Sequence, residues 1–463
     1  MYIIIIGAGR IGSTVAESLV GESNDITVID PDAAKIDELQ GRLDLRGVTG
    51  DATSPSVLME AGAADADLLI AVTASDETNL VVCLIASRLF NIPARIARVR
   101  KSELRKYPRL LAEEGFEITS SIWPEEALTD GIVRLIDFPE ALQVIDFADG
   151  KASLIAVRAV AGSPLVGRQI RELATHLPEV PARIVSVFRR NRNLDISSNT
   201  VIESGDEVIA LAATRDIRRV ASELRRSEEP ARHIIVGGSL LLAKQLCESL
   251  PGRRYSIKVI EEDSAQALAA MQTFPENALI LEGSITEEKT LEDAGIDMCD
   301  LFLALGQDDE NNIMSCLLAK KMGANRVISL INRKTYADLV QGTQIDITVS
   351  LTQATLGELL RHVRRGDVIA AHSLRRGVAE ALEVVAHGTP ETSRVVGRAI
   401  RRVALPDGVS IAALVRGSDE SAKIILAEPD IQIEAEDHVI LFVPNKRLIP
   451  KIEELFMVDV GFF

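Results

Sequence analysis

A short apolar strand, a glycine-rich turn and a helix open this sequence and constrain its fold more than any other stretch. Residues 3–6 are four isoleucines, the turn is Gly7-Ala8-Gly9-Arg10-Ile11-Gly12, and a helical pattern runs over 13–20. In such a turn the first glycine permits the tight bend, the second lets backbone N–H groups approach a phosphate, and the third lets the helix pack on the strand. A phosphate there also meets the positive end of the helix dipole. The stretch therefore predicts a nucleotide-binding fold.

A carboxylate follows the second predicted strand. Ile26-Thr27-Val28-Ile29 reads as that strand and is followed by Asp30, where an acidic side chain accepts hydrogen bonds from an adenosine ribose. The alternative is an ordinary surface aspartate at a strand end. No arginine follows within Pro31-Asp32-Ala33, and a carboxylate repels a 2′-phosphate, so NADP is disfavoured.

Composition excludes several classes of protein. The 463 residues should form roughly three or four domains of about 100 to 150 residues each. A net charge of −17 and an aromatic content of 3% argue against nucleic acid as a partner, because charge attraction and base stacking would both be weak. We expect neither a signal peptide nor a membrane-spanning helix, since the sequence shows no basic leader and no apolar run of about 18 residues.

Four cysteines, at 83, 247, 299 and 316, show no spacing of the metal-binding or redox kind. Cys83 and Cys316 lie in apolar helical runs, which predicts small core residues in a reducing compartment. The six histidines show no ligand pattern either. We therefore expect no metal site.

Strands and helices alternate through the first 120 residues. Further strands are predicted at 44–48, 68–72, 95–99 and 116–119, with helices at 33–40 and 79–90. This alternation is typical of a doubly wound parallel sheet that binds its ligand at the carboxyl ends of the strands.

The pattern recurs after about 230 residues. Val259-Ile260-Glu261 matches Val28-Ile29-Asp30, and the segment 304–312 matches 71–79. A region of short β-like runs also recurs, since SPLVGRQI at 163–170 parallels SRVVGRAI at 393–400. A constant period of this kind indicates a duplication. We predict an α/β chain with two Rossmann-like doubly wound parallel sheets, each followed by a small α+β module.

The predicted domains follow one another along the chain. They are a nucleotide-binding domain at 1–121, a bridging helix at 122–140, a small module at 141–226, a degenerate nucleotide fold at 232–350, a second bridging helix at 351–367 and a second module at 368–458.

The second glycine turn is degraded. Gly237-Gly238-Ser239 follows the strand at 233–236, and this alignment puts Ser239 in the place of Gly9 and Leu242 in that of Gly12. A left-handed backbone at Ser239 would cost roughly 1 to 2 kcal/mol, about a tenfold loss of affinity. We favour an empty, structural second site. Weak binding with Glu261 on the ribose is the alternative.

An Asp-Glu-x-Asn pattern persists in the degraded half. It occupies 309–312 there and 76–79 in the first half. Because this motif is kept in the copy whose phosphate-binding turn is lost, we expect it to serve the fold or a domain interface rather than the ligand. Helix capping by Ser75 and Asp308 explains part of it.

Three arginines are candidates for phosphate contact. Arg10 lies within the glycine turn, where its guanidinium would form charge-assisted hydrogen bonds with a terminal phosphate. Arg98 and Arg100 end the fifth strand near the same crevice. The alternatives are a solvated helix start for Arg10 and surface pairing with carboxylates for Arg98 and Arg100.

No catalytic constellation is recognisable. A dehydrogenase needs a general acid or base beside its nicotinamide, and neither small module pairs a histidine with a carboxylate in a recognisable setting. Binding without chemistry fits better. An NAD-dependent oxidoreductase with an unrecognised substrate site is the competing hypothesis.

Over essentially its whole length the chain resembles the TrkA family, the regulatory subunits of bacterial Trk potassium uptake systems, built from tandem RCK units. The motifs that carry the resemblance are IIIIGAGRIG (3–12), VIDPD (28–32), GDAT (50–53), AVTASDETN (71–79), ARVR (97–100), SPLVG (163–167) and GDEVIAL (205–211). The departure is GGSLLL at 237–242, which breaks the glycine pattern.

The resemblance implies binding of NAD(H) or ATP/ADP. The residues it implies are Gly7, Ala8, Gly9, Arg10, Ile11, Gly12, Asp30, Asp51, Thr73, Ala74 and Arg98. It also implies a homotetrameric gating ring on the cytoplasmic face of the plasma membrane, beneath a membrane-embedded, TrkH-like potassium transporter subunit.

Overall fold

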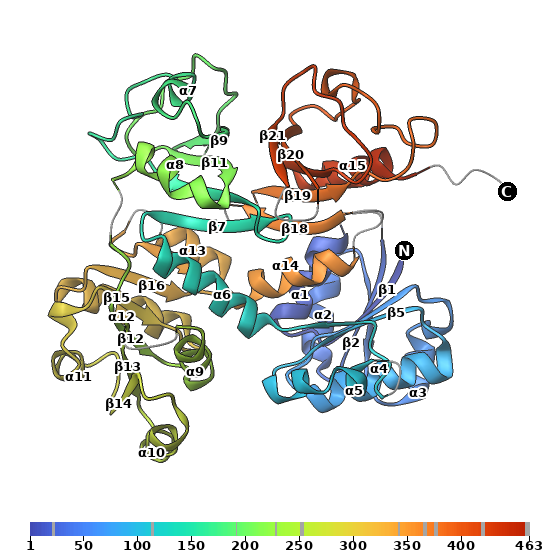
Figure 1. The fold of residues 1–463 in the computed structure, drawn as a ribbon. Helices are drawn as coiled ribbons and strands as arrows, with labels where there is room; N and C mark the ends of the chain where they lie inside the picture. The colour runs from blue at the N-terminus through green and yellow to red at the C-terminus, as the bar shows by residue number, and fades with distance from the viewer. Residues whose placement is uncertain are drawn as a thin grey trace. The chain divides into compact units, whose positions relative to one another are not determined.

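The computed structural model describes residues 1–20, 24–112, 115–190, 192–226, 229–250, 254–340, 343–363, 368–374, 378–417 and 422–458. Within these residues the chain forms two six-stranded parallel sheets and two five-stranded antiparallel sheets (Figure 1). The predicted fold class, two doubly wound sheets with two small α+β modules, is confirmed.

The first parallel sheet has the strand order β3-β2-β1-β4-β5-β6. Its elements are β1 (Tyr2–Ile6), α1 (Arg10–Val20), β2 (Asp25–Asp30), α2 (Ala33–Arg42), β3 (Arg46–Thr49), α3 (Pro55–Glu60), β4 (Leu68–Ala71), α4 (Asp76–Phe90), β5 (Ala94–Arg98), α5 (Pro108–Leu111) and β6 (Ser120–Ile122). The strand order reverses between β1 and β4, and ligands of doubly wound sheets bind at such a switch point.

The sixth strand differs from the prediction. It is Ser120–Ile122 rather than 116–119, because Glu117 has a left-handed backbone with φ of 55° and cannot continue an extended strand. The backbone N–H of Ile118 donates to the carbonyl oxygen of Leu111, which holds this stretch against α5 instead.

The isoleucine run is buried on both faces of the sheet. Ile3, Ile4, Ile5 and Ile6 are each at most 1% exposed. A parallel strand covered by helices on both sides needs a continuous apolar run rather than an alternating one. The four isoleucines thus place β1 at the centre of the sheet.

The second parallel sheet repeats this topology with the order β14-β13-β12-β15-β16-β17. Its elements are β12 (His233–Gly237), α9 (Leu240–Ser249), β13 (Ser256–Glu261), α10 (Ser264–Thr273), β14 (Ala278–Glu282), α11 (Glu288–Asp293), β15 (Leu301–Ala304), α12 (Asp309–Lys321), β16 (Arg326–Leu330), α13 (Lys334–Leu339) and β17 (Ile347–Val349).

The two glycine turns correspond differently from the sequence alignment. Ile6 pairs with Ile29 in the first sheet, and Gly237 pairs with Ile260 in the second, so the residues that follow, Gly7 and Gly238, are equivalent. Both have a positive φ, 103° and 93°. The expected correspondence of Gly237 with Gly7 was wrong by one residue, because two adjacent glycines left the register undecided.

The corrected register changes which residues replace the first copy's glycines. The buried positions of α1 and α9 agree with it, since Val15 and Ala16 match Leu246 and Cys247. Leu240 therefore stands for Gly9, and Ala243, rather than Leu242, for Gly12. Ser239 has φ of −148° and needs no left-handed backbone, so the anticipated strain is absent.

The Asp-Glu-x-Asn pattern supports the fold in both copies, as expected. Asn79 accepts the backbone N–H of Thr73 and donates to the carbonyl oxygen of Arg98, both at 3.0 Å. Asn312 makes the two equivalent contacts, both at 2.8 Å. Each asparagine thereby ties together the two turns that follow its neighbouring strands.

The predicted caps are also present. Ser75 caps α4 by accepting the N–H of Thr78, and Asp308 caps α12 in the same way. The Asp76 carboxylate accepts the backbone N–H of Arg100 at 3.1 Å, which holds the end of β5 against the start of α4.

Each small module is an antiparallel sheet. The first has the order β10-β9-β11-β8-β7 and the second β18-β19-β22-β20-β21. The strands are β7 (Ala141–Phe147), β8 (Ala152–Arg158), β9 (Ala182–Arg189), β10 (Arg192–Asn193), β11 (Glu207–Ala213), β18 (Val368–Leu374), β19 (Ala379–Val385), β20 (Ser410–Arg416), β21 (Lys423–Leu426) and β22 (His438–Val443), and the helices are α7 (Glu172–His176), α8 (Ile217–Leu224) and α15 (Ile449–Phe456).

The two small modules pack on each other, because one hydrophobic cluster includes Phe147 and Phe188 of the first module and Ala381 and Phe442 of the second.

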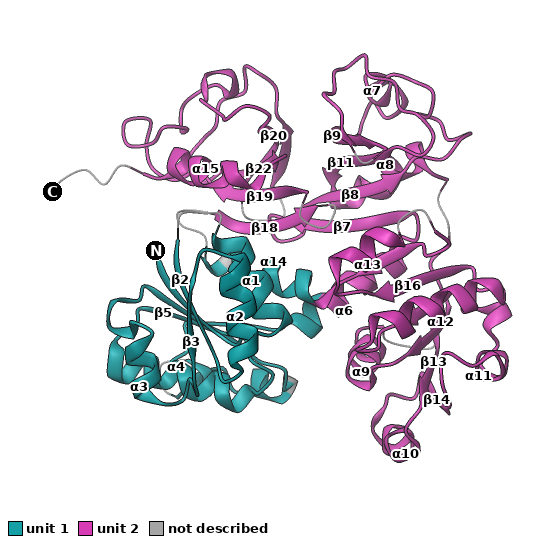
Figure 2. Cartoon of the chain, turned by 180° about the vertical axis from the view of Figure 1, so that it is seen from behind, with its two compact units in different colours: residues 1–127, 352–364 teal, residues 128–351, 365–463 magenta. Residues whose placement is uncertain are grey.

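Two compact units divide the chain, and they do not follow its two halves (Figure 2). One unit comprises residues 1–127 and 352–364, and the other comprises 128–351 and 365–463. The helix α14 (Leu351–Val363) comes from the second half but lies almost entirely in the first unit. There Glu358 accepts the backbone N–H of Trp123 at 2.7 Å.

Most of the other bridging helix, α6 (Pro124–Asp137), belongs to the second unit. In that unit Arg326 of β16 donates to the carbonyl oxygens of Leu135 and Ala141, at 3.1 and 2.7 Å. Residues 364–367, the end of the second predicted bridging segment, lie outside the described residues. No helix in the described part of the chain is long and apolar enough to cross a membrane.

All four cysteines are buried, as predicted for Cys83 and Cys316. Burial raises the pKa of each thiol to about 12. Because the thiolate is the reactive form, we expect native protein at pH 8 to release no thionitrobenzoate from Ellman's reagent within minutes, and denatured protein to release four equivalents. A fast-reacting thiol in the native state would contradict the packing of these side chains.

We expect Asn79→Ala to destabilise the first unit by about 2 kcal/mol, because it removes the partner of the partly buried N–H of Thr73 and of the buried C=O of Arg98. The only tryptophan of the sequence, Trp123, belongs to that unit, so urea denaturation followed by its fluorescence reports there. Asn312→Ala is the matched control in the other unit and should leave this transition in place. Equal shifts of the urea transition in both variants would show that the hydrogen bonds of Asn79 do not act within the first unit alone.

Candidate nucleotide site

The glycine turn after β1 has the geometry that a phosphate-binding turn needs. A Cβ on Gly12 would lie 1.8 Å from the carbonyl oxygen of Gly7, so only glycine lets α1 start this close to the strand. A Cβ on Gly9 would meet nothing within 4 Å. The free space at Gly9 suits a group that approaches the backbone from outside the protein.

Asp30 fixes the shape of this turn. Its side chain is buried, Oδ2 accepts the backbone N–H of Ala8 at 2.7 Å, and Oδ1 accepts that of Asp32 at 2.9 Å. The carboxylate is therefore not the plain surface aspartate of the alternative interpretation. It joins the ends of β1 and β2 at the position where a ribose would lie.

Arg10 is exposed and forms no ion pair within the part of the chain that the structure describes. Its carbonyl oxygen accepts the hydroxyl groups of Ser13 and Thr14, at 3.0 and 2.9 Å, which closes the first turn of α1. Ile11 is half-buried behind it. The guanidinium is thus available to a ligand at the helix N-terminus.

The turn after β4 faces the glycine turn. A Cβ on Gly7 would lie 3.4 Å from Thr73, so the two turns lie next to each other. The Thr73 hydroxyl lies 2.7 Å from Oδ1 of Asn79, which holds the turn in place, and Ala74 is exposed at its tip.

Asp51 follows β3 at the same edge of the sheet. Its carboxylate accepts the backbone N–H and the hydroxyl of Thr53, at 2.9 and 2.8 Å, and these hydrogen bonds lower the pKa of the carboxyl group. Asp51 is exposed and lies beyond β2, farther from the switch point than Asp30.

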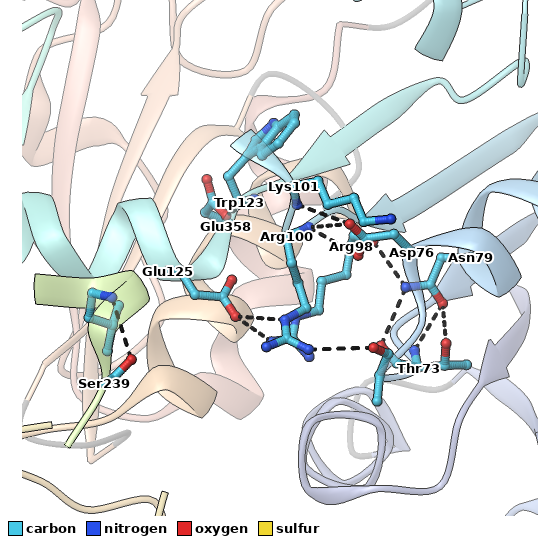
Figure 3. A network of polar contacts seen from close by, with 12 residues as sticks. Thr73, Asp76, Asn79, Arg98, Arg100, Lys101, Trp123, Glu125, Ser239 and Glu358 are labelled. Carbon is cyan, nitrogen blue, oxygen red and sulfur yellow. Dashed lines mark hydrogen bonds and ion pairs between the residues drawn. The ribbon is translucent and has the colours of Figure 1, made fainter. Parts of the chain in front are cut away.

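Arg98 forms a buried ion pair that the sequence did not reveal (Figure 3). Its Nη2 lies 2.7 Å from Oε1 of Glu125, and the two side chains are only 9% and 7% exposed. Nε of Arg100 lies 3.5 Å from the same oxygen. Glu125 is in the first turn of α6, and the acidic pair directly after Pro124 was the available signal.

The Arg98 guanidinium retains an unused donor. Its Nε is buried and has no hydrogen-bond partner among the described residues. A buried N–H of this kind usually has a partner, often water or ligand. Pairing with a carboxylate, the alternative to phosphate contact for Arg98 and Arg100, is thus observed, but Arg98 is buried in the pair rather than on the surface, and its Nε–H stays without a partner among the described residues.

The two equivalent positions of the second copy, both among the described residues, do not carry this pair. Leu330 holds the register position of Arg98, since each ends its strand opposite the last residue of the next strand. Thr352 follows β17 at the distance at which Glu125 follows β6. Arginine and glutamate are thus both replaced in the second copy. This is expected, because one buried charge without its partner would be strongly destabilising.

Glu261 belongs to the second sheet and lies apart from the residues above. It is half-buried and accepts the backbone N–H of Asp263 at 3.0 Å. In the glycine turn of the same sheet, the Ser239 hydroxyl accepts the N–H of Leu242 and caps α9. The protein itself therefore occupies part of the helix N-terminus that a phosphate would use.

The first sheet thus gathers the glycine turn, Asp30, the Thr73 turn and the two arginines at the carboxyl ends of β1, β2, β4 and β5. These features define a class of protein with two tandem Rossmann-like folds, of which one has a degenerate nucleotide site. Each fold is followed by a small module. The TrkA-N domain model matches residues 3–116 and 233–351, and the TrkA-C domain model matches 154–225 and 387–457. The chain belongs to the TrkA family.

Curated relatives agree with this assignment over the full length. The chain is 47% identical over 463 residues to the Trk system potassium uptake protein TrkA of Halomonas elongata, covering all of both chains. It is 46% identical to the protein of the same name from Vibrio alginolyticus, covering 98% of each, and 44% identical to that of Haemophilus influenzae, covering all of both.

Solved structures support the fold. The GsuK RCK domain has a TM-score of 0.62 at 17% identity, covering 98% of this chain and 94% of that one. A GsuK channel bound to NAD has a TM-score of 0.61 at 18% identity, covering 98% and 78%. At these identities the likeness concerns architecture alone.

We expect Glu125→Thr to destabilise the first unit by about 3 to 5 kcal/mol, because it leaves the Arg98 guanidinium buried without its carboxylate. The double variant Arg98→Leu/Glu125→Thr, which installs the residues of the second copy, should recover most of this loss. Urea denaturation followed by Trp123 fluorescence measures both. Additive losses in the double variant would mean that the two side chains do not act as a pair.

Proposed function

We propose that this chain is a regulatory subunit that binds NAD(H) or ATP/ADP at the first sheet and thereby controls a membrane-embedded, TrkH-like potassium-conducting partner. The observation that carries the proposal is the intact turn Gly7–Gly12, in which Arg10 is exposed. The relatives are named potassium uptake proteins, and a GsuK channel of the same fold is bound to NAD. In this proposal four copies form a gating ring at the cytoplasmic face of the membrane.

The site residues have distinct roles in this proposal. The turn Gly7–Gly12 and Arg10 bind phosphate, and Asp30 binds the ribose. Asp51, Thr73 and Ala74 line the crevice, and Arg98 and Arg100 add positive charge. The second sheet, with Leu240, Ala243 and a capped α9, is a structural copy, and Glu261 offers at most a weak ribose contact. The domain boundaries proposed are those predicted from the sequence.

The proposed role is regulatory rather than catalytic. A ligand controls a gate only through different affinities for its two states. Moving a gate from mostly closed to mostly open takes roughly 5.5 kcal/mol, which is about 1.4 kcal/mol for each of four sites. A single charge-assisted hydrogen bond to a phosphate oxygen is of that size. A difference between ATP and ADP at Arg10 would therefore be enough.

We expect Arg10→Ala to reduce the preference between ATP and ADP by about tenfold, because the guanidinium that it removes would bind the terminal phosphate. Isothermal titration calorimetry of the full chain with each nucleotide measures the ratio. Arg42→Ala is a control, since Arg42 is exposed at the far end of α2 and pairs with Glu38. If Arg10→Ala left the ratio of the two affinities unchanged, the Arg10 side chain would not contact the terminal phosphate.

The competing function, an NAD-dependent oxidoreductase, has a direct test. Purified protein is incubated with NADH and candidate carbonyl acceptors while absorbance at the nicotinamide band is followed. The regulatory proposal expects binding without turnover. Protein-dependent oxidation of NADH that disappears in Gly12→Ala would favour the enzyme.

A further inference from the structure

The second parallel sheet ends in an exposed edge strand. β14 pairs with β13 on one side, from Ile257–Ala278 to Glu261–Glu282, and is last in the strand order. Figure 1 shows β14 at the margin of its sheet with α10 beside it. Backbone N–H and C=O groups on the outer side of such a strand are free to pair with another extended chain.

Large apolar side chains flank this edge. Leu268 and Met271 of α10 are 62% and 57% exposed, and Leu279 of β14 is 54% exposed. Charged residues usually protect a free edge against pairing. Here the first four of the five strand residues, Ala278-Leu279-Ile280-Leu281, are uncharged and apolar, and only the last, Glu282, carries a charge.

The first copy shows how the same edge looks when it is protected. Asp32 and Asp263 cap α2 and α10 at equivalent positions, so Leu268 stands for Asp37 and Met271 for Gln40. Leu279 pairs with Lys258 as Arg46 pairs with Thr27, so Leu279 stands for Arg46. Three positions that carry polar residues in the first copy therefore carry apolar residues in the second.

The three side chains lie on both faces of the edge. Gln40 lies over β3, because a Cβ on Gly47 would be 2.7 Å from its Oε1. Met271 holds the equivalent position in α10, the helix that packs on β14. Leu279 precedes the residue equivalent to Gly47 and projects from the opposite face. An added strand would thus meet apolar groups on each of its two faces.

Acidic residues surround this apolar edge. Glu262, Asp263, Glu276 and Glu282 are exposed around the ends of α10 and β14. No lysine or arginine occurs between residues 259 and 288, and Lys258, the register partner of Leu279, is half-buried and donates to the carbonyl oxygen of Ala294. The surface therefore complements an extended apolar segment that carries basic flanks.

We propose that the β14 edge, flanked by Leu268, Met271 and Leu279, binds an extended apolar, Lys/Arg-flanked cytoplasmic segment of the membrane-embedded partner by strand addition. The inference rests on the proposed function for the existence of that partner. Cytoplasmic loops of membrane proteins carry an excess of lysine and arginine, which matches the acidic surround. A second copy of this chain is a poorer occupant, since a two-fold contact would bring the acidic residues against themselves.

The test uses the substitutions Leu268→Asp, Met271→Gln and Leu279→Arg together in the full chain. These residues occur at the equivalent positions of the first copy, and the net charge is unchanged. Binding is measured by biolayer interferometry to the purified potassium-conducting subunit in nanodiscs. We expect affinity at least about tenfold lower, with unchanged nucleotide binding and unchanged thermal unfolding. Met59→Gln, at a methionine 67% exposed in the first copy, is the control and should bind normally.

A photo-cross-linking amino acid at position 279 identifies the occupant. The expected product joins position 279 to an apolar cytoplasmic segment of the subunit that has basic flanks. Undiminished binding by the triple variant, or a cross-link to a second copy of this chain or to lipid, would overturn this inference and leave the proposed function standing. Failure of the unaltered chain to bind the nanodiscs would overturn the proposed function and this inference with it.

Discussion

The contact between the start of α1 and the glycine turn is the constraint on which the candidate site depends. With no Cβ at Gly12, the helix begins against the carbonyl oxygen of Gly7, and its free N–H groups face the switch point of the sheet. The buried Asp30 carboxylate then holds the turn through Ala8. A larger residue at 12 would displace the helix, and with it the positive end of its dipole.

The second copy shows that the fold does not require this contact. Ala243 stands where Gly12 would be, and α9 begins at Leu240, the equivalent of Gly9, one residue earlier than α1. The asparagine that ties the turns is kept, as are the helix caps. What has diverged is the phosphate turn, the Arg98–Glu125 pair and the outer edge of the sheet. Duplication has therefore separated the features that serve the fold from those free to serve a ligand or a partner.

Much of the site could be predicted from the sequence, because it depends on residue type and spacing over short stretches. The glycine turn, the strand that ends at Asp30 and the caps at Ser75 and Asp308 each follow from residue type and spacing over a few positions. The register of the second turn was misassigned by one residue, because Gly237 and Gly238 are chemically identical and only the strand pairing with Ile260 distinguishes them. The sixth strand was misplaced because nothing local shows that Glu117 is left-handed.

The sequence by itself determined the two doubly wound sheets, their small modules, the duplication and the one intact glycine turn, since periodicity and turn chemistry act over short distances. Only the tertiary structure decided that Arg98 is paired with Glu125, that α14 lies with the first nucleotide fold, and that Leu268, Met271 and Leu279 gather at one edge. The contacts of Arg98 with Glu125 and of Trp123 with Glu358 join residues that are distant in the chain. Their formation depends on how whole elements pack, which residue spacing does not encode.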